Sequence, residues 1–266
     1  MDRFFVSPAV LQIQPVVLTG EQAHQVRRVL RLRPGERVML LDNLGSAYDA
    51  VLLGYGQEDA RFRIEGQRLA SGEPATHLTL FQAALKGERF EWVLQKGTEI
   101  GASRFVPVIC ERNVVDDRRA VDGKRERWQR IIQEAAEQSG RAHLPELAPS
   151  MQFADAVRSG SASTAPKGSA SGETPPETTT IRLIPWEGLR DAGQGRPLRE
   201  ALAGCNLRVG TRIEIFIGPE GGFSKAEIEL AQNHQILPVS LGPRILRAET
   251  AGVVAAATIM YEVGEI

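Results

Sequence analysis

The stretch Ile213-Glu214-Ile215-Phe216-Ile217-Gly218-Pro219-Glu220-Gly221-Gly222-Phe223 carries an apolar strand pattern straight into a loop with three glycines. A second junction of this kind follows, where residues 237–241 run into Gly242-Pro243-Arg244 and on to Thr250. Glycine lets a backbone approach a ligand closely and adopt positive φ. Loops that leave the carboxyl ends of strands in an open α/β sheet are where such folds bind small molecules. The two junctions therefore predict one small ligand, contacted mainly by main-chain groups.

Composition and charge limit the class of protein. With 266 residues, of which 42% are hydrophobic and 24% charged, the chain has the ordinary composition of a globular protein of one or two domains. The net charge of −1 excludes a global positive field, so any basic surface must be local. Cys110 and Cys205 lack the spacing of a disulfide framework or a metal site, and no other cluster of ligands has it, so no metal is predicted.

The sequence offers no targeting or membrane-spanning pattern. It begins Met-Asp-Arg-Phe-Phe, without the apolar core of a signal peptide. Its most apolar stretch, residues 251–260, is too short to span a bilayer. Because the two cysteines also fit a reducing compartment, we expect a cytoplasmic protein that does not cross a membrane.

Residues 1–74 are β-rich and end in Ser71-Gly72-Glu73-Pro74, a plausible domain boundary. A helical pattern over residues 21–32 interrupts the strands. We therefore predict a small barrel-like domain with one helix over residues 1–74. Its expected strands are residues 37–41, 47–53 and 62–65, with a hairpin turn at residues 42–46.

From residue 75 to residue 266, short apolar strands alternate with amphipathic helices. Such alternation implies a mostly parallel sheet that is covered by helices on both faces. A capping-box pattern begins one helix at Ser224, and Gly101 is a suitable residue to end another. The predicted strands are residues 78–83, 105–109, 181–184, 213–217 and 237–241, and the other predicted helices are residues 90–100 and 127–140.

Residues 159–180 depart from this alternation. They are rich in Ser, Ala, Gly, Thr and Pro and have almost no large apolar side chain. Such a segment buries too little apolar surface to offset the conformational entropy that ordering it would cost. We therefore expect a flexible, low-complexity surface insertion over residues 159–180 within the second domain.

The first glycine loop does not have the form of a phosphate-binding motif. No Gly-Lys-Ser/Thr follows it, as in a P-loop, and it lacks the G-x-G-x-x-G spacing of dinucleotide-binding folds. Glu220 within the loop would also repel a polyphosphate. A neutral or cationic ligand fits better, such as a nucleoside that carries a sulfonium. On fold grounds alone, a glycine-rich turn without any ligand is an equally good interpretation.

In combination, the two loops resemble those of the SPOUT-class methyltransferases that modify N3 of a uridine in bacterial small-subunit (16S) ribosomal RNA. The resemblance covers nearly the whole chain; the departures are Ile100, in place of an expected leucine, and the insertion at residues 159–180. The matching segments are His24 with Val29-Leu30-Arg31, residues 95–101, Arg127-Trp128, residues 134–141, Pro145, residues 217–223 and residues 241–251.

The resemblance implies a fold, a cofactor and an assembly. The fold would be a PUA-like β-barrel at residues 1–74, followed at residues 75–266 by a SPOUT-type α/β domain with a C-terminal trefoil knot. The cofactor would be S-adenosyl-L-methionine, and the protein would work as a homodimer. The residues that match the cofactor-binding positions of the family are Ile184, Pro185, Gly218, Pro219, Glu220, Gly221, Leu241, Gly242, Ile245 and Leu246.

Two residues at the second loop are predicted to be catalytic. Uridine N3 carries a weakly acidic proton, which must leave as the nitrogen is methylated. Arg247 would stabilise negative charge on the uracil oxygens. Glu249 would orient Arg247 or accept the proton, a role that is also open to Glu220. The alternative for each carboxylate is a hydrogen bond that braces its loop, and for Arg247 it is a structural salt bridge.

RNA contacts are predicted first from a local cluster of basic residues. Arg27, Arg28, Arg31 and Arg33 lie close together in the sequence of the first domain, and His24, just before them, would contact RNA, form a structural hydrogen bond or act as a general base. Such a cluster offers a phosphate-binding face despite the neutral overall charge. Its alternative is an arginine-rich face that is merely solvated.

Two more arginines enter through the resemblance. Arg112 and Arg141 stand at positions that match the family, and they would reach the RNA either within one subunit or across a dimer interface. The alternative is that they form salt bridges with Glu99 or Glu134, and the sequence leaves this choice open.

The sequence thus predicts an S-adenosylmethionine-dependent methyltransferase that acts on N3 of a uridine in small-subunit ribosomal RNA, either free or within an assembled subunit. One alternative is an enzyme of the same class that modifies another RNA nucleotide. The other is a noncatalytic RNA-binding protein of ribosome assembly, and the intact second loop argues against it. Affinity for S-adenosylmethionine separates this last interpretation from the first two.

Overall fold

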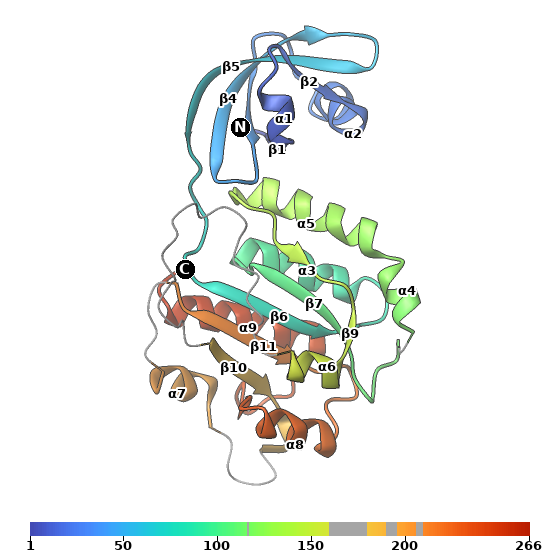
Figure 1. The fold of residues 1–266 in the computed structure, drawn as a ribbon, viewed down its shortest axis with the longest axis vertical. Helices are drawn as coiled ribbons and strands as arrows, with labels where there is room; N and C mark the ends of the chain where they lie inside the picture. Colours follow the sequence, from blue (N-terminus) through green and yellow to red (C-terminus); the bar gives the residue numbers. More distant parts are fainter. Residues whose placement is uncertain (116, 160–179, 190–195, 206–209) are drawn as a thin grey trace. The chain divides into compact units, whose positions relative to one another are not determined.

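The computed structural model describes residues 1–115, 117–159, 180–189, 196–205 and 210–266. These residues form two compact units (Figure 1). The N-terminal unit contains residues 1–73 and 133–144, and the α/β unit contains residues 74–132 and 145–266. Most of the predicted flexible insertion, residues 160–179, lies outside the described residues.

The N-terminal unit is built on a curled sheet with the strand order β1-β3-β4-β5-β2. The pairing of β1 with β3 is parallel, and the other pairings are antiparallel. Phe4, Leu40 and Phe62 are fully buried at the centre of its apolar core. The elements are β1 (Arg3–Phe5), α1 (Pro8–Leu11), β2 (Val16–Thr19), α2 (Gly20–His24), the π-helix η1 (Gln25–Val29), β3 (Arg37–Leu41), β4 (Ser46–Tyr55) and β5 (Asp59–Leu69).

The hairpin predicted at residues 42–46 joins β3 and β4. Asp42 Oδ1 accepts hydrogen bonds from the backbone N–H groups of Leu44 and Ser46, at 2.8 and 2.9 Å. Gly45 has a φ of 103°, a conformation that a side chain would strain. A single helix was predicted over residues 21–32. The structure has instead the short α-helix α2, which continues directly into the π-helix η1 and ends at Val29.

The end of α5 (Arg125–Ser139) belongs to the N-terminal unit. Ala136 is fully buried in one apolar cluster with Phe5. The carboxylate of Glu137 accepts a hydrogen bond from the backbone N–H of Phe5 at 3.0 Å. Phe5 and Glu137 are 132 residues apart, so no local sequence pattern predicts that residues 133–144 pack with the strands of the N-terminal unit.

The α/β unit contains, within its described residues, a seven-stranded sheet with the order β12-β10-β11-β6-β7-β8, in which β9 also pairs with β7. All of these pairings are parallel, and every strand predicted beyond residue 75 is present. The strands are β6 (His77–Ala83), β7 (Arg104–Ile109), β8 (Glu146–Leu147), β9 (Met151–Gln152), β10 (Thr180–Pro185), β11 (Arg212–Ile217) and β12 (Leu237–Val239).

Helices cover both faces of this sheet. Consecutive residues of β6 point to opposite faces, so Leu80 packs in one core cluster and Phe81 in the other. This explains the continuous apolar runs of the strands. The first face is covered by α3 (Arg89–Ile100), the start of α5, α7 (Leu198–Ala203) and α9 (Ala248–Glu262), and the second by α6 (Phe153–Arg158) and α8 (Lys225–Asn233).

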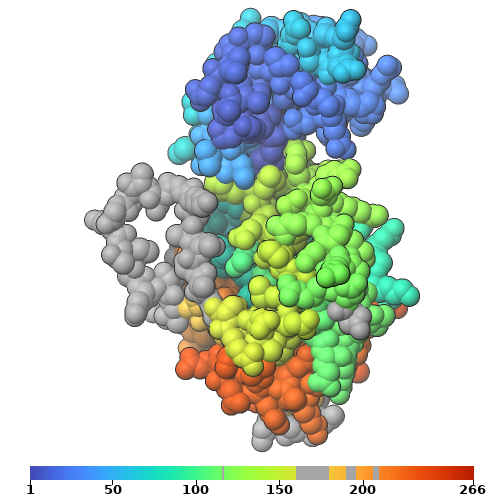
Figure 2. Space-filling view, turned by 45° about the vertical axis from the view of Figure 1, so that its right-hand side comes forward, coloured from blue at the N-terminus to red at the C-terminus, as the bar shows by residue number. Residues whose placement is uncertain are grey.

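Two helix boundaries agree with their sequence signals. The helix α3 ends at Gly101, which has a left-handed φ of 113°, and α8 begins at Ser224 with both hydrogen bonds of a capping box. Figure 2 shows α6 (yellow) and α8 (orange) side by side on the surface of the second face. The short elements α4 (Arg118–Asp122) and η2 (Glu187–Leu189) complete the unit. Among the residues that the structure describes, no helix is long and apolar enough to cross a bilayer.

Candidate functional site

The first glycine loop leaves the carboxyl end of β11 and is closely packed. A Cβ on Gly222 would lie 2.2 Å from Oε1 of Glu187, and the φ of +67° at this position also disfavours a side chain. A Cβ on Gly218 would lie 3.1 Å from the ring of Phe223. The positive φ of Gly222 and the ring beside Gly218 therefore both favour glycine on local structural grounds, independently of any ligand.

This loop is anchored to the segment that follows β7. Glu227 closes the capping box of α8 with Ser224, and its other oxygen accepts a hydrogen bond from the backbone N–H of Glu111 at 2.9 Å. Arg112 donates to the carbonyl of Gly221 at 3.2 Å. The loop is thus held at its centre and at its end, which fixes the position of its backbone.

The second loop leaves β12 and ends where α9 begins. Ser240 Oγ accepts a hydrogen bond from the N–H of Gly242 at 3.2 Å, and Gly242 has a φ of +105°. Arg247 is the N-cap residue of α9, but its side chain makes no capping hydrogen bond. The loop therefore places Arg247 and Glu249 close together at the start of α9.

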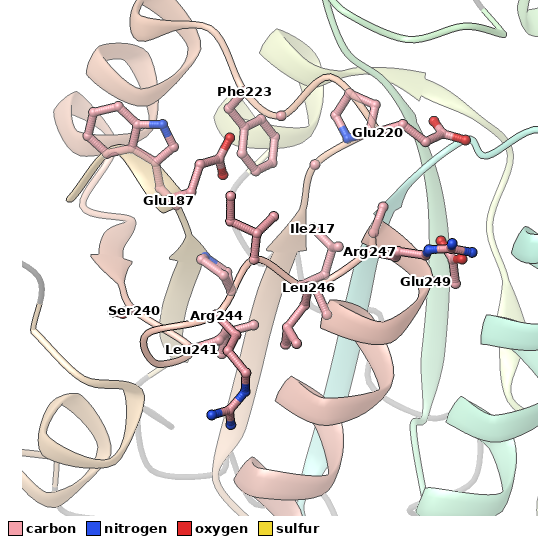
Figure 3. A pocket seen from close by; sticks show the side chains of 18 of the residues that line it. Glu187, Ile217, Glu220, Phe223, Ser240, Leu241, Arg244, Leu246, Arg247 and Glu249 are labelled. Atoms are coloured by element: carbon pink, nitrogen blue, oxygen red, sulfur yellow. The ribbon is translucent and has the colours of Figure 1, made fainter. Parts of the chain in front are cut away.

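The two loops enclose a cavity, because β12, β10 and β11 are neighbours and their carboxyl ends share one edge. Its volume is about 480 Å³, within the range of small-molecule sites. Figure 3 shows Glu187 and Phe223 on one side of it and Arg247 and Glu249 on the other. Its lining consists of Arg89, Pro185, Trp186, Glu187, residues 217–220, Gly222, Phe223, residues 240–242, residues 244–249 and Ala251.

Nearly all of the predicted cofactor-binding residues line this cavity. The two exceptions are Ile184 and Gly221. Ile184 is fully buried in the core cluster under α8, because alternation along β10 turns it away from its neighbour Pro185. Gly221 is exposed and packs against Arg112. The residues that do line it are Pro185, Gly218, Pro219, Glu220, Leu241, Gly242, Ile245 and Leu246.

Arg89 connects two acidic residues at the rim of the cavity. Its Nη1 lies 3.1 Å from Oε1 of Glu220, and its Nε lies 4.0 Å from Oε1 of Glu249. The second oxygen of Glu249 is buried and has no hydrogen-bond partner among the described residues. Sequence reasoning missed Arg89, which belongs to no motif and reaches the cavity only because β6 lies next to β11.

Arg247, the predicted catalytic residue, is exposed and lines the cavity. Within the described part of the chain, its guanidinium has no ion pair or hydrogen bond. The alternative of a structural salt bridge therefore has no partner there. Arg244 lines the cavity from the same loop, and its guanidinium likewise has no ion pair or hydrogen bond among the described residues. Both cations remain available to a ligand.

The basic residues predicted to contact RNA lie at a second, smaller cavity in the N-terminal unit. Its volume is about 280 Å³, and it is lined by Gly20, Ala23, His24, Arg27, Arg28, Gln57 and Glu58. The π-helix that carries Arg28 is a rare element, often found at functional sites. Arg31 follows it with a left-handed φ of 55°. His24, Arg28 and Arg31 are exposed.

Arg27 differs from the other members of this cluster. Its guanidinium lies 4.6 Å from the centre of the Tyr55 ring and donates to the carbonyl of Gln57 at 2.9 Å. It also donates to the carbonyl of Gly56. These contacts join the π-helix to the loop between β4 and β5. Arg27 therefore has a structural task, which leaves less of its guanidinium for RNA.

Arg112 and Arg141 have contrasting surroundings. Arg112 is exposed near the first glycine loop. Arg141 is only 3% exposed and forms a two-pronged ion pair with Glu73, in which Nε lies 2.9 Å from Oε2. A buried, paired guanidinium cannot reach a phosphate without a large loss of stability. The geometry thus favours the salt-bridge alternative for Arg141, with Glu73 as the partner.

Among the described residues, no group of three or more His, Cys, Asp or Glu side chains could hold a metal ion. Cys110 is buried, and its burial raises the pKa of the thiol far above its usual range. The thiol therefore stays neutral and is a poor nucleophile.

Comparison with known families and sequences is consistent with this geometry. Residues 72–260 match the RNA methyltransferase domain family, and residues 18–65 match the RNA methyltransferase PUA domain family. The ribosomal RNA small subunit methyltransferase E of Synechocystis is 36% identical over 97% of this chain and 76% of that protein. The protein of the same name from Bacillus subtilis is 28% identical over 98% of this chain and 97% of its own.

Solved structures extend the likeness to the fold. A methyltransferase from Legionella pneumophila, solved with S-adenosylmethionine, has a TM-score of 0.80 at 29% identity and covers 98% of this chain and 97% of that one. A ribosomal RNA small subunit methyltransferase E from Neisseria gonorrhoeae, bound to S-adenosylmethionine, has a TM-score of 0.79 with the same identity and coverage. The predicted fold class, a PUA-like sheet followed by a SPOUT-type α/β domain, is confirmed. The chain belongs to the ribosomal RNA small subunit methyltransferase E family.

Proposed function

We propose that this protein transfers the methyl group of S-adenosyl-L-methionine to N3 of a uridine in small-subunit ribosomal RNA. The observation that carries the proposal is the cavity between the two glycine loops, in a chain whose relatives from Legionella and Neisseria hold that cofactor. Such a substrate also supports a cytoplasmic site of action, next to the ribosome.

The residues of the cavity suit the proposed cofactor. Gly218 and Gly242 leave main-chain groups open to an adenosine, and Leu241 and Leu246 offer apolar contacts to its base. Glu220 at the rim favours a cationic sulfonium over a polyphosphate. When bound, the cofactor supplies a methyl group that is already activated. The task left to the protein is to position the RNA base and to handle its proton.

Two residues of the second loop fit the remaining chemistry. As the bond between N3 and the methyl carbon forms, the N3 proton must leave and negative charge develops on the uracil oxygens. Arg247, exposed at the cavity, is suited to stabilise that charge. Glu249, which lines the cavity close to Arg247, is the proposed acceptor of the proton.

The N-terminal unit is the proposed RNA-binding part, at residues 1–74 in the sequence-based division. Its match to a PUA domain family supports this role. His24, Arg28 and Arg31 supply exposed donors, and none of them has a side-chain partner among the described residues. Phosphate binding by such residues gives affinity without sequence specificity.

The proposed assembly is a homodimer that is formed through α9. The middle of this helix, residues 251–257, consists of small and apolar residues, yet one protomer buries only part of it. Val254 and Tyr261 are 37% and 69% exposed, and their spacing puts them on one helix face. Trp92 of α3, the helix that packs beside α9, is 41% exposed. An identical surface on a second copy would cover these side chains.

Methyl transfer to small ribosomal subunits that lack the modification tests the function directly. With labelled cofactor, we expect label in 3-methyluridine when nucleosides are separated and identified by mass spectrometry. Subunits that already carry the modification serve as the control and should take up none. Label in another nucleoside would overturn the N3 assignment, and absence of both transfer and cofactor binding would favour the noncatalytic alternative.

Replacement of Arg247 by alanine tests charge stabilisation. We expect kcat to fall by about 10²- to 10³-fold, because loss of one such donor typically costs that much. Cofactor affinity, measured by calorimetry, should stay unchanged, and Arg247→Lys should retain intermediate activity. Full turnover by Arg247→Ala would refute the catalytic role.

Charge reversal at Arg28 and Arg31 tests the RNA surface. The double Glu variant should bind subunit RNA more weakly, and the slope of log affinity against log salt should fall by about 2, one unit for each lost phosphate contact. The matched control is Arg37→Glu with Arg63→Glu, two exposed arginines of the same unit that pair with Glu65. If both double variants lost RNA affinity equally, the proposed role of Arg28 and Arg31 in RNA binding would be wrong.

Sedimentation tests the dimer. The protein should have twice its chain mass of 29.1 kDa at micromolar concentration. Val254→Glu combined with Tyr261→Glu should give a folded monomer, because two charges would be buried without partners. Leu237→Glu, another exposed apolar position of the α/β unit, is the control and should remain a dimer. A monomeric native protein would contradict the proposal.

A further inference from the structure

The loops that follow β6 and β7 continue the sheet edge beyond the cavity. Because β11, β6 and β7 are neighbouring parallel strands, their carboxyl ends share one edge of the sheet. The loop after β6, residues 84–88, leads directly into Arg89 at the cavity. In the loop after β7, residues 110–115, Arg112 donates to the carbonyl of Gly221 in the first glycine loop at 3.2 Å. These two loops, here called the edge surface, therefore adjoin the wall of the cavity.

Hydrogen bonds of Asn113 hold the two loops of the edge surface together. Its Nδ2 donates to the carbonyl of Ala84 at 2.6 Å, and its Oδ1 accepts from the N–H of Cys110 at 2.9 Å. The N–H of Glu111 donates in turn to the carboxylate of Glu227 in α8. The backbone of the edge surface is thus fixed, and its exposed side chains lose less entropy when they bind a partner.

Two cations of the edge surface have no acidic partner. Lys86 is exposed and makes no hydrogen bond or ion pair among the described residues. Arg112 is exposed, and its bond to Gly221 uses one of the five N–H donors of the guanidinium. Neither cation pairs with Glu88 or Glu111, the acidic residues of these loops, in the part of the chain that the structure describes. The surface therefore suits one or two phosphate groups better than a long duplex.

An exposed apolar side chain accompanies these cations. Val114, in the loop after β7, is 62% exposed. An unpaired RNA strand presents base and ribose surfaces beside each phosphate. Such a strand would cover Val114 while its phosphates meet the cations, which a free inorganic anion would not do.

The proposed reaction requires RNA contacts near the cavity. N3 of uracil lies on the Watson–Crick edge, so the base must be unpaired before it can reach the methyl group. Enzymes that act on a single base extrude it into a pocket, while the backbone on either side of it stays outside. The exposed residues proposed above for RNA binding, His24, Arg28 and Arg31, all belong to the N-terminal unit. The α/β unit needs contacts of its own to hold the nucleotide at its cavity.

We propose that the edge surface binds the RNA backbone next to the target nucleotide. Lys86 and Arg112 are the phosphate-binding residues, and Val114 contacts an adjoining ribose or base. The partner is an unpaired RNA strand whose target base enters the cavity. This inference rests on the proposed function, and it gives neither cation a contact with the reacting atoms.

Binding of small ribosomal subunits to Lys86→Gln, and to the double variant Lys86→Gln with Arg112→Gln, tests this contact. Each lost phosphate contact should lower the affinity by about three- to tenfold. The slope of log affinity against log salt should fall by about 0.7 for each contact, the value for single strands. Lys86→Arg keeps the charge and should bind as the native protein does. Unchanged affinity and slope in both Gln variants would refute the proposal.

The matched control is Arg158→Gln, which removes another exposed cation of the α/β unit. Arg158 is 60% exposed at the end of α6 and belongs neither to the edge surface nor to the cavity lining. Its variant should bind subunits like the native protein, and an equal loss of affinity there would refute a specific contact. Affinity for S-adenosylmethionine should be unchanged in Lys86→Gln; a loss would show that Lys86 serves the cofactor and would overturn the proposal.

Hydroxyl-radical footprinting of the bound subunits shows which nucleotides the edge surface covers. The native protein should protect riboses beside the uridine that the transfer assay identifies. The double Gln variant should lose this protection, whereas Arg28→Glu with Arg31→Glu should lose protection at other nucleotides. Protection beside the target that persists in the double Gln variant would contradict the proposal. Absence of methyl transfer by the native protein would sink the proposed function, whereas affinity and salt slope are measured without turnover and decide the edge surface by themselves.

Discussion

The parallel pairing of β10 with both β11 and β12 is the constraint on which the cavity depends. In register, Leu183 lies opposite both Ile215 and Leu237, so the three strands end at the same edge. β6 flanks β11 on its other side and brings the start of α3 to that edge as well. Four chain segments with no sequence proximity therefore meet around one volume. The site is a property of strand order more than of any single motif.

Close packing around the glycines holds this edge in one conformation. A Cβ on Gly218 would lie 3.1 Å from the ring of Phe223, and the φ of +67° at Gly222 disfavours any side chain there. The hydrogen bond from Glu111 to Glu227 joins the same loop to the segment after β7. Loops that are fixed in this way lose little entropy when a ligand binds, which is the benefit of preorganisation.

Local patterns in the sequence predicted the elements that local physics controls. The strand that ends at Ile217 and the capping box at Ser224 could be read directly, because apolar runs and caps have short-range signatures. The link from Arg89 to Glu220 could not, since it spans 131 residues and depends on which strands become neighbours. The face to which Ile184 points was likewise undecided, because alternation along a strand gives two faces without saying which one meets a ligand.

The helix α5 also bears on how independent the first 74 residues are. A fragment that ended there would lack Ala136 beside Phe5, and it would leave the carboxylate of Glu73 without the guanidinium of Arg141. Apolar surface and a charge that the whole chain covers would then face water. The first 74 residues are thus not a complete structural unit by themselves. If recombination moved them onto another protein, that protein would have to supply a segment equivalent to residues 133–144.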